Sequence, residues 1–129
     1  MGDDVVAASI AEGNVAVVRR ALTDLASLPD LISEDLVWHF FGSIDGIATD
    51  HVGRENVEAN FWGKLFEISE GHFAVDPVNI WPAGDELVVA HVKVTIGADG
   101  DAIDAVEVYR VRGGRITEAY DVPATIAEP

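Results

Sequence analysis

Apolar residues near the start of the chain recur at helical spacing. One stripe follows Asn14, a favourable N-cap residue, and predicts a helix that runs to about Ala26. Its members are Val15, Val18, Leu22 and Leu25. The preceding stretch 5–12 is apolar and rich in alanine, so we expect 1–13 to be an N-terminal extension or a short helix that ends at Gly13.

A second stripe with the same spacing lies between Gly53 and Gly71 and predicts another helix. Its members are Val57, Phe61, Leu65 and Ile68. Pro29 suits the first turn of a short helix over Pro29–Ser33. Residues 42–53 contain three glycines and several charged or histidine side chains, so we expect them to form a loop.

The segment Leu36–Phe41 reads Leu-Val-Trp-His-Phe-Phe, a run typical of a strand. Because side chains alternate along a strand, His39 is expected to point the same way as Val37 and Phe41, toward a core or a pocket. A titratable ring in that position is either a hydrogen-bonded core residue or part of a site.

Four further apolar runs in the second half of the chain predict a meander of long strands. They are His72–Trp81, Glu86–Ile96, Ala102–Arg112 and Arg115–Val122, and the turns between them are rich in Pro, Gly and Asp. Helices followed by such a meander indicate an α+β domain in which the helices pack on one face of the sheet.

The short turns also predict how the last three strands pair. Centring them on the Asp-Gly and Gly-Gly pairs places His91 opposite Val108, and Val106 opposite Asp121. One face of the sheet then carries His91, Lys93, Asp104, Val106, Val108, Ala119 and Asp121. The other carries Val92, Val94, Tyr109, Val111, Ile116, Tyr120 and Val122, a set so apolar that it favours a homodimer. A slip of one residue in either hairpin would separate the members of each set.

Composition narrows the class of protein. The chain has 129 residues, 49% of them apolar, which predicts one globular domain over 1–129. There are 23 Asp and Glu against 8 Lys and Arg, a formal charge of -15, so the surface repels phosphate backbones and anionic lipids. We therefore expect no nucleic-acid partner and no membrane partner. The chain has no cysteine, no signal-like N-terminus and no long apolar run, and we expect a cytoplasmic protein.

Five segments in order resemble a known family: "NVAVVRRAL", "EDLVWHFFG", "HVGRENVEANFWGKL", "DELVVAHVKVT" and "VYRVRGGRITEAYDV". Together they cover roughly 14–123 and resemble the SnoaL-like, ketosteroid-isomerase-like branch of the nuclear transport factor 2-like superfamily. The resemblance implies a cone-shaped α+β fold, in which a strongly curved sheet wraps around helices and encloses an apolar pocket, commonly in a homodimer. Members include ketosteroid isomerases, polyketide cyclases and epoxide hydrolases of the limonene type, and some members only bind or scaffold.

The isomerase residues carry over unevenly. The resemblance implies a catalytic aspartate three positions before a glycine, and the residue three before Gly42 is His39. The isomerase tyrosine would fall near Ala21 or Leu22, neither of which can donate a hydrogen bond. The second acid would fall at Val106, so the steroid-isomerase triad is not intact.

The other activities of the family point to the last strands. In the cyclases an aspartate on the last strand is the acid/base, and Asp121 occupies a similar place. Asp104 lies two residues before Val106 on the same predicted face and could serve as a second acid. The epoxide hydrolases need an Asp-Arg-Asp constellation, but here the arginine is missing and Lys93 is the only nearby cation.

The candidate catalytic residues are His39, Asp121, Asp104 and His91. The His39 imidazole could exchange a proton at neutral pH, and a nearby Asp121 carboxylate would fix its tautomer and stabilise its charged form. Structural interpretations stand beside these roles. His39 could be a hydrogen-bonded core or rim residue, and Asp121 could accept backbone or Arg115 hydrogen bonds. His91 could be a satisfied sheet residue, and Asp104 a solvated carboxylate.

Ligand-binding candidates are aromatic and small apolar residues, which are also typical of a core or a dimer interface. They are Trp38, Phe41, Phe61, Trp62, Val106, Val108 and Ala119. The four histidines show no close ligand spacing, so no metal site is expected, and the proposed chemistry needs no cofactor.

Two classes of function remain open at this point. The first is a small enzyme that performs isomerisation, aldol-type cyclisation or water addition on a small hydrophobic carbonyl or epoxide compound. The second is a non-catalytic protein that binds a small hydrophobic molecule or serves as a dimeric scaffold. The polar residues on one predicted sheet face favour the enzyme, whereas the missing tyrosine and arginine favour the second class.

Overall fold

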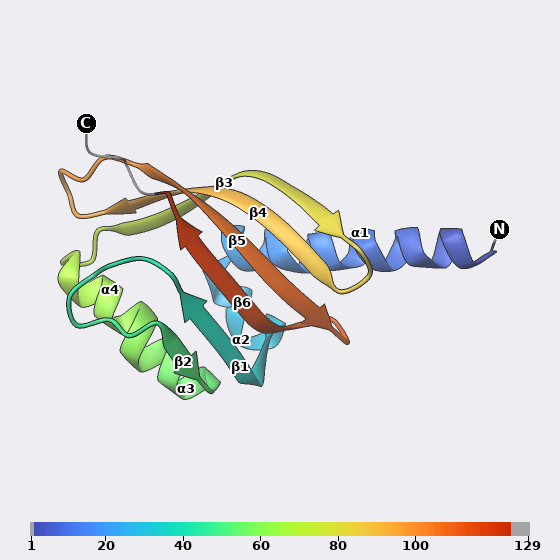
Figure 1. The fold of residues 1–129 in the computed structure, drawn as a ribbon, viewed down its shortest axis with the longest axis horizontal. Coiled ribbons are helices and arrows are strands. Elements are labelled where there is room, and N and C mark those ends of the chain that lie inside the picture. Colours follow the sequence, from blue (N-terminus) through green and yellow to red (C-terminus); the bar gives the residue numbers. More distant parts are fainter. Residues whose placement is uncertain (1, 125–129) are drawn as a thin grey trace.

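A strongly curved sheet of six strands organises residues 2–124, the part of the chain that this computed structural model describes (Figure 1). The strands are β1 (Ile32–Phe40), β2 (Asp50–Val52), β3 (Phe73–Ala83), β4 (Leu87–Ile96), β5 (Ile103–Arg112) and β6 (Arg115–Pro123). They are ordered β2-β1-β6-β5-β4-β3, and neighbours run antiparallel except β1 and β6, which are parallel. A strand from the first half of the chain therefore lies beside the last strand.

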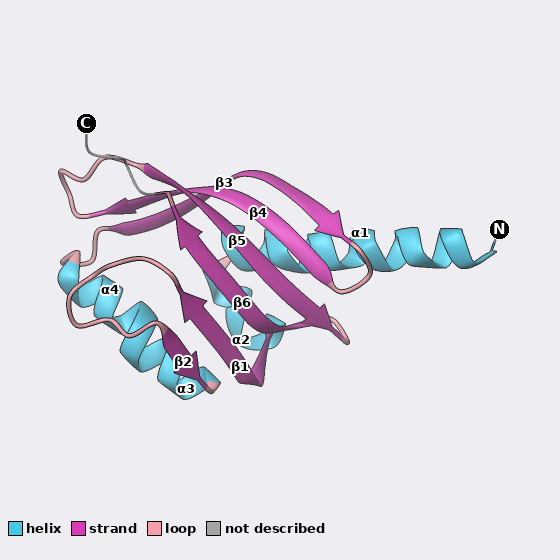
Figure 2. Cartoon of the chain, in the orientation of Figure 1, coloured by secondary structure: helices cyan, strands magenta, loops and turns pink. Residues whose placement is uncertain are grey.

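Helices lie along the inner side of this sheet (Figure 2). They are α1 (Gly2–Thr23), the 3₁₀ turn η1 (Leu25–Ser27), α2 (Leu28–Leu31), α3 (Arg54–Val57), the π-helical segment η2 (Glu58–Trp62) and α4 (Gly63–Ile68). The last three follow one another without a break and form one helical rod. The α1 helix packs against β3 and β4, and α3 packs against β1.

The N-terminal region differs from the prediction, because one uninterrupted helix replaces the two that were expected. Gly13 does not end the helix, and a methyl group at that position would meet open space. Asn14 is not an N-cap: its side-chain amide donates a 2.8 Å hydrogen bond to the backbone oxygen of Asp85. This bond ties the middle of α1 to the turn between β3 and β4. The first turns of α1 project beyond the sheet in Figure 1.

The segment predicted to be a loop, 42–53, contains the short strand β2. This strand pairs with β1 so that Trp38 lies opposite His51 and His39 opposite Asp50. The helix after Gly53 and the four long strands form as predicted, with ends shifted by one or two residues.

The register of the last hairpin decides which residues share a face. Between β4 and β5 the predicted pairing is off by two residues, so His91 lies opposite Val106 and the faces are preserved. Between β5 and β6 a bulge at Thr117 adds one residue to β6. Beyond that bulge every β6 side chain faces the side opposite to the one predicted, because side chains alternate with a period of two.

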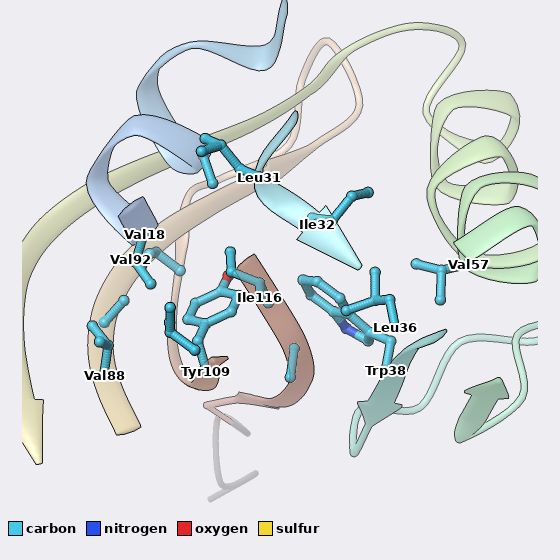
Figure 3. Packing of buried hydrophobic residues seen from close by; sticks show 14 of the residues in the cluster. Val18, Leu31, Ile32, Leu36, Trp38, Val57, Val88, Val92, Tyr109 and Ile116 are labelled. Atoms are coloured by element: carbon cyan, nitrogen blue, oxygen red, sulfur yellow. The ribbon is translucent and has the colours of Figure 1, made fainter. Parts of the chain in front are cut away.

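The hydrophobic core lies between the inner face of the sheet and the helices (Figure 3). Figure 3 shows Tyr109 and Trp38 near its centre, with Val18 of α1 on one side and Val57 of α3 on the other. Val92, Tyr109 and Val111 belong to the face that favoured a homodimer in the sequence, yet they are already buried within one chain. The homodimer stays a prediction, but this apolar face does not require one.

Candidate functional site

A cavity of about 950 Å³ opens between the inner face of the sheet, the α3–η2–α4 rod and the end of α1. Most of its wall is aliphatic or aromatic. Its ionisable lining groups are Asp76, Glu107, Tyr109 and Asp121, and no lysine, arginine or histidine of the described residues lines it. A large apolar cavity with a few convergent polar groups is the usual form of a small-molecule site.

Two carboxyl groups stand side by side in the wall of this cavity. Glu107 of β5 and Asp121 of β6 are register partners across the antiparallel pair, so both point to the inner face. Their residues are only 4% and 8% exposed. Phe40 of β1 lies on the other side of Asp121 in the sheet. Two acids buried this closely cannot both ionise without a large cost.

The environment separates the pKa values of the two acids. Burial raises the pKa of Glu107 to about 8, and repulsion from Asp121 adds to that rise while the hydrogen bond from Tyr109 opposes it. Burial also raises the pKa of Asp121 to about 6, although Trp38 and Glu107 lower it. The two acids titrate as a pair, so together they hold one proton at neutral pH. The higher pKa of Glu107 places that proton mainly on Glu107.

Tyr109 and Trp38 complete the polar part of the wall. The Tyr109 hydroxyl donates a 2.6 Å hydrogen bond to Oε1 of Glu107, and burial raises the pKa of this phenol well above its ordinary value, so it remains a donor. The buried Nε1–H of Trp38 forms no hydrogen bond within residues 2–124, although it lies close enough to Asp121 to lower the pKa of that carboxyl. Its effect on Asp121 is therefore that of a nearby dipole rather than of a formed hydrogen bond.

Aromatic rings surround the carboxyl pair on the helix side. The ring centroid of Trp38 lies 5.4 Å from that of Phe61, 5.5 Å from that of Trp62 and 5.9 Å from that of Tyr109. Phe61 and Trp62 are consecutive residues, and both line the cavity. They lie in the π-helical segment η2, whose wider turn is a common local irregularity at functional sites.

The prediction that His39 faces the pocket is wrong. Trp38 and Phe40 point to the inner face, so His39 between them points to the outer face. There its Nδ1 lies 2.8 Å from Asp50 Oδ1 and its Nε2 lies 2.9 Å from Glu118 Oε2. Burial lowers the pKa of His39, but these two carboxylates outweigh it and raise the pKa overall. His39 therefore joins β2 to β6 through β1, and it does not meet Asp121.

The other polar candidates also lie on the outer face. His91 Nε2 and Lys93 Nζ are 2.7 and 2.9 Å from Asp104 Oδ1, and these hydrogen bonds lower the pKa of Asp104. Asp104 is therefore an ionised surface carboxylate. Of the four predicted catalytic residues, only Asp121 lines the cavity.

Of the predicted ligand-binding residues, some line the cavity and others do not. The cavity is lined by Trp38, Phe61 and Trp62, so these three candidates lie where a ligand could contact them. Ala119 is fully buried on the inner face without lining the cavity. The residues that instead lie on the outer face are Phe41, which is 55% exposed, Val106, which is 43% exposed, and Val108.

Glu107 is the functional candidate that the sequence did not reveal. Pairing counted from the Gly-Gly turn without a bulge places Val106 opposite Asp121. The bulge in β6 shifts that pairing by one residue, so Glu107 lies opposite Asp121 instead. The available signal was the charge itself: Glu107 is an acid between two valines in the run Ala-Val-Glu-Val-Tyr. An acid that alternation assigns to a buried face is an anomaly, and here the bulge makes it the partner of Asp121.

Within residues 2–124 no group of three or more His, Asp or Glu side chains is arranged to hold a metal ion. No helix in that part of the chain is both long and apolar enough to cross a membrane.

Comparison with solved structures identifies relatives of the whole fold. Bal32a, from a soil-derived mobile gene cassette, is 26% identical and matches 88% of this chain and 91% of its own, with a TM-score of 0.78. A Xanthomonas campestris protein of unknown function with a cystatin-like fold is 25% identical over 87% of this chain and 91% of its own, with a TM-score of 0.76. A provisionally assigned SnoaL-like polyketide cyclase from Jannaschia sp. CCS1 is 18% identical over 88% of this chain and 87% of its own, with a TM-score of 0.69.

These likenesses confirm the predicted cone-shaped fold of the nuclear transport factor 2-like superfamily. No curated protein matches the chain in sequence. The family model for the SnoaL-like domain matches residues 20–119. This range includes Glu107 and most of the cavity wall, and it ends two residues before Asp121. The chain therefore belongs to the SnoaL-like domain family.

Proposed function

We propose that this protein catalyses proton transfer on a small hydrophobic carbonyl compound, without a cofactor. The observation that carries this proposal is the Glu107–Asp121 pair, which shares one proton in the wall of an apolar cavity of about 950 Å³. Catalytic acids and bases need pKa values near the working pH, and burial has moved both carboxyls into that range.

The two carboxyl groups would take different roles in the reaction, one as the base and one as a hydrogen-bond donor. Ionised Asp121 would remove a proton from the carbon next to the carbonyl group. Protonated Glu107, held by the Tyr109 hydroxyl, would donate a hydrogen bond to the carbonyl oxygen as it becomes an enolate oxygen. Return of the proton to another carbon gives isomerisation, and attack of the enolate carbon on a second carbonyl of the same molecule gives aldol-type cyclisation.

Water addition to an epoxide has less support from the cavity. That chemistry, as the family resemblance implies it, uses an arginine between two acids. Among the described residues no arginine lines the cavity, and Arg110 lies on the outer face with Glu86 and Glu118. Proton abstraction next to a carbonyl group needs only the acids that are present.

A carbonyl probe tests the first step without knowledge of the natural substrate. We expect the protein to exchange the α-protons of 2-tetralone for deuterium in D₂O, as followed by proton NMR. Asp121→Asn should slow this exchange by about 10²-fold or more, the usual contribution of a general base. Asp104→Asn is the matched control, since it makes the same change on the outer face, and should exchange at the parent rate. Absence of exchange with 2-tetralone and other hydrophobic ketones, or equal rates in parent and Asp121→Asn, would contradict the proposal.

The exchange rate should also depend on pH in a bell shape. It should rise with pH as Asp121 ionises, with a limb at about 6, and fall as Glu107 loses its proton, with a limb at about 8. Glu107→Gln keeps a hydrogen-bond donor but cannot lose a proton, so we expect the alkaline limb to disappear. A profile that is flat between pH 5 and 9 in the parent would exclude the pair as the acid and the base.

The alternative is a non-catalytic protein that binds a small hydrophobic molecule. The buried Nε1–H of Trp38 forms no hydrogen bond within residues 2–124, and such an unsatisfied donor favours a bound ligand that supplies an acceptor. Binding of 2-tetralone with no exchange at any pH would support this function. A homodimer and a cytoplasmic location stay predictions from the sequence.

A further inference from the structure

The charges around the cavity are of one sign. Its ionisable lining groups are three carboxyls and one phenol, and no cationic side chain of the described residues accompanies them. The protein as a whole carries a formal charge of -15. An anionic ligand would therefore enter an apolar space in which no positive group compensates its lost hydration, and the negative charge of the carboxyl pair would repel it.

A cation in the same place would meet the opposite conditions. Glu107 and Asp121 hold one proton because ionising both would place two like charges in a buried space. A positive group between them removes that repulsion, so both carboxyls can ionise. Buried charges are tolerated where they are paired in this way.

The aromatic wall adds a second attraction for a cation. Trp38 is surrounded by Phe61, Trp62 and Tyr109, with ring centroids 5.4 to 5.9 Å apart, and all four line the cavity. The face of an aromatic ring carries partial negative charge and attracts ammonium groups within about 6 Å. The remaining aliphatic wall suits the hydrocarbon part of such a ligand.

We propose that the cavity binds hydrophobic amines as cations, with the ammonium group at the Glu107–Asp121 pair, and that it rejects the corresponding carboxylates. The ammonium N–H groups donate hydrogen bonds to the two carboxylates. The proton that the pair shared leaves to the buffer, so one proton is released for each amine bound. This binding uses the same pair as the proposed proton transfer, but it requires no turnover.

Three ligands with the same hydrocarbon skeleton separate charge from shape. 2-Aminotetralin is a cation near neutral pH, 2-tetralone is neutral, and tetralin-2-carboxylate is an anion. We expect isothermal titration calorimetry at pH 7 to show the amine binding at least about tenfold more tightly than the carboxylate, since 1.4 kcal/mol corresponds to about a factor of ten. Titrations in phosphate and in Tris, which differ in ionisation enthalpy, should show release of up to one proton with the amine only.

The affinity for the amine should rise with pH by up to about tenfold per unit while the pair still holds its proton. The groups that face the pair are the Tyr109 hydroxyl, from β5, and the Trp38 indole, from β1. Neither changes charge between pH 6 and 8, because the pKa of Tyr109 is raised well above its ordinary value and an indole does not titrate there. The pH dependence therefore reports on the carboxyls.

Variants test whether the proton release and the preference for a cation arise from the Glu107–Asp121 pair. Glu107→Gln should bind 2-aminotetralin without releasing a proton, because Asp121 alone is already ionised at pH 7. Glu107→Gln combined with Asp121→Asn should bind the amine and the carboxylate with affinities that differ less than in the parent. Asp104→Asn, which removes a carboxylate from the outer face, should behave like the parent. Circular dichroism of each variant confirms that it is folded.

Several results would overturn the proposal. They are failure of the amine to bind, equal binding of the carboxylate, amine binding by the parent without proton release, and unchanged charge preference in the double variant. None of these results depends on catalysis. Amine binding with proton release but no exchange of 2-tetralone would contradict only the proposed function, and exchange without amine binding would contradict only this inference.

Discussion

Glu107 and Asp104 show how strongly position determines the chemistry of an acidic side chain. They lie three residues apart on β5, but on opposite faces of the sheet. Asp104 is half exposed and paired with Lys93 and His91, which lower its pKa. Glu107 is buried, and burial raises its pKa to about 8. Only the second of these acids can carry a proton at neutral pH, which is what an acid catalyst requires.

Glu107 should make the protein less stable as the pH rises. Its pKa is raised in the folded state from the ordinary value of 4.5 to about 8. Its favourable contribution is therefore complete below pH 4.5 and is lost as the pH rises toward and past 8. Urea denaturation at pH 5, 7 and 9 should show the parent losing up to a few kcal/mol, since one pKa unit is worth about 1.4 kcal/mol.

Glu107→Gln cannot ionise, so its stability should fall less over the same pH range. Asp104→Asn should keep the parent's decline, because the lowered pKa of Asp104 affects stability only on the acid side of its ordinary value. Parallel curves for the parent and Glu107→Gln would show that Glu107 ionises in the folded protein as freely as in the unfolded chain.

Among the elements, β6 illustrates what the sequence predicted and what it did not. Its position, length and antiparallel pairing with β5 followed from apolar alternation and the Gly-Gly turn, and the structure confirms them. The bulge at Thr117 has no comparable signal, because a single extra residue changes neither the composition of a strand nor its turns. That one residue reverses the faces of Ala119 and Asp121, which is why the predicted site combined residues from both faces.

The π-helical segment η2 should be sensitive to a methyl group at Gly63. The Gly63 N–H donates to the carbonyl of Glu58, and a Cβ at Gly63 would lie 3.0 Å from that oxygen. Replacing an exposed helical glycine with alanine usually stabilises a helix by about 1 kcal/mol. We expect Gly63→Ala to lose this gain and to be no more stable than the parent in urea denaturation.

Gly13→Ala in α1 is the matched control, because a Cβ there meets no atom within 4 Å. It should raise the free energy of unfolding by about 0.5 to 1 kcal/mol. An equal gain for Gly63→Ala would show that the π-helical turn exerts no constraint at this position.

At the scale of the whole molecule, the fold was predictable because many weak signals agree on it. The predicted helical stripe is buried at Val57, Phe61 and Leu65, although its last member, Ile68, is exposed. The meander of strands forms in the predicted order. The cavity was predicted only through the family resemblance, since no local pattern encodes an empty space. The face of His39 was not predictable from alternation alone, because alternation shows that neighbours differ and not which of them points inward.

The parallel pairing of β1 with β6 has a consequence for how the protein is made. More than half of the chain separates these strands in the sequence, and their pairing brings Phe40 beside Asp121. Contacts between such distant segments form slowly, because a long loop must close first. During synthesis the wall that holds the carboxyl pair cannot exist until β6 has left the ribosome. Until then the apolar inner face of the sheet is incomplete, and exposed apolar surface of this kind favours aggregation.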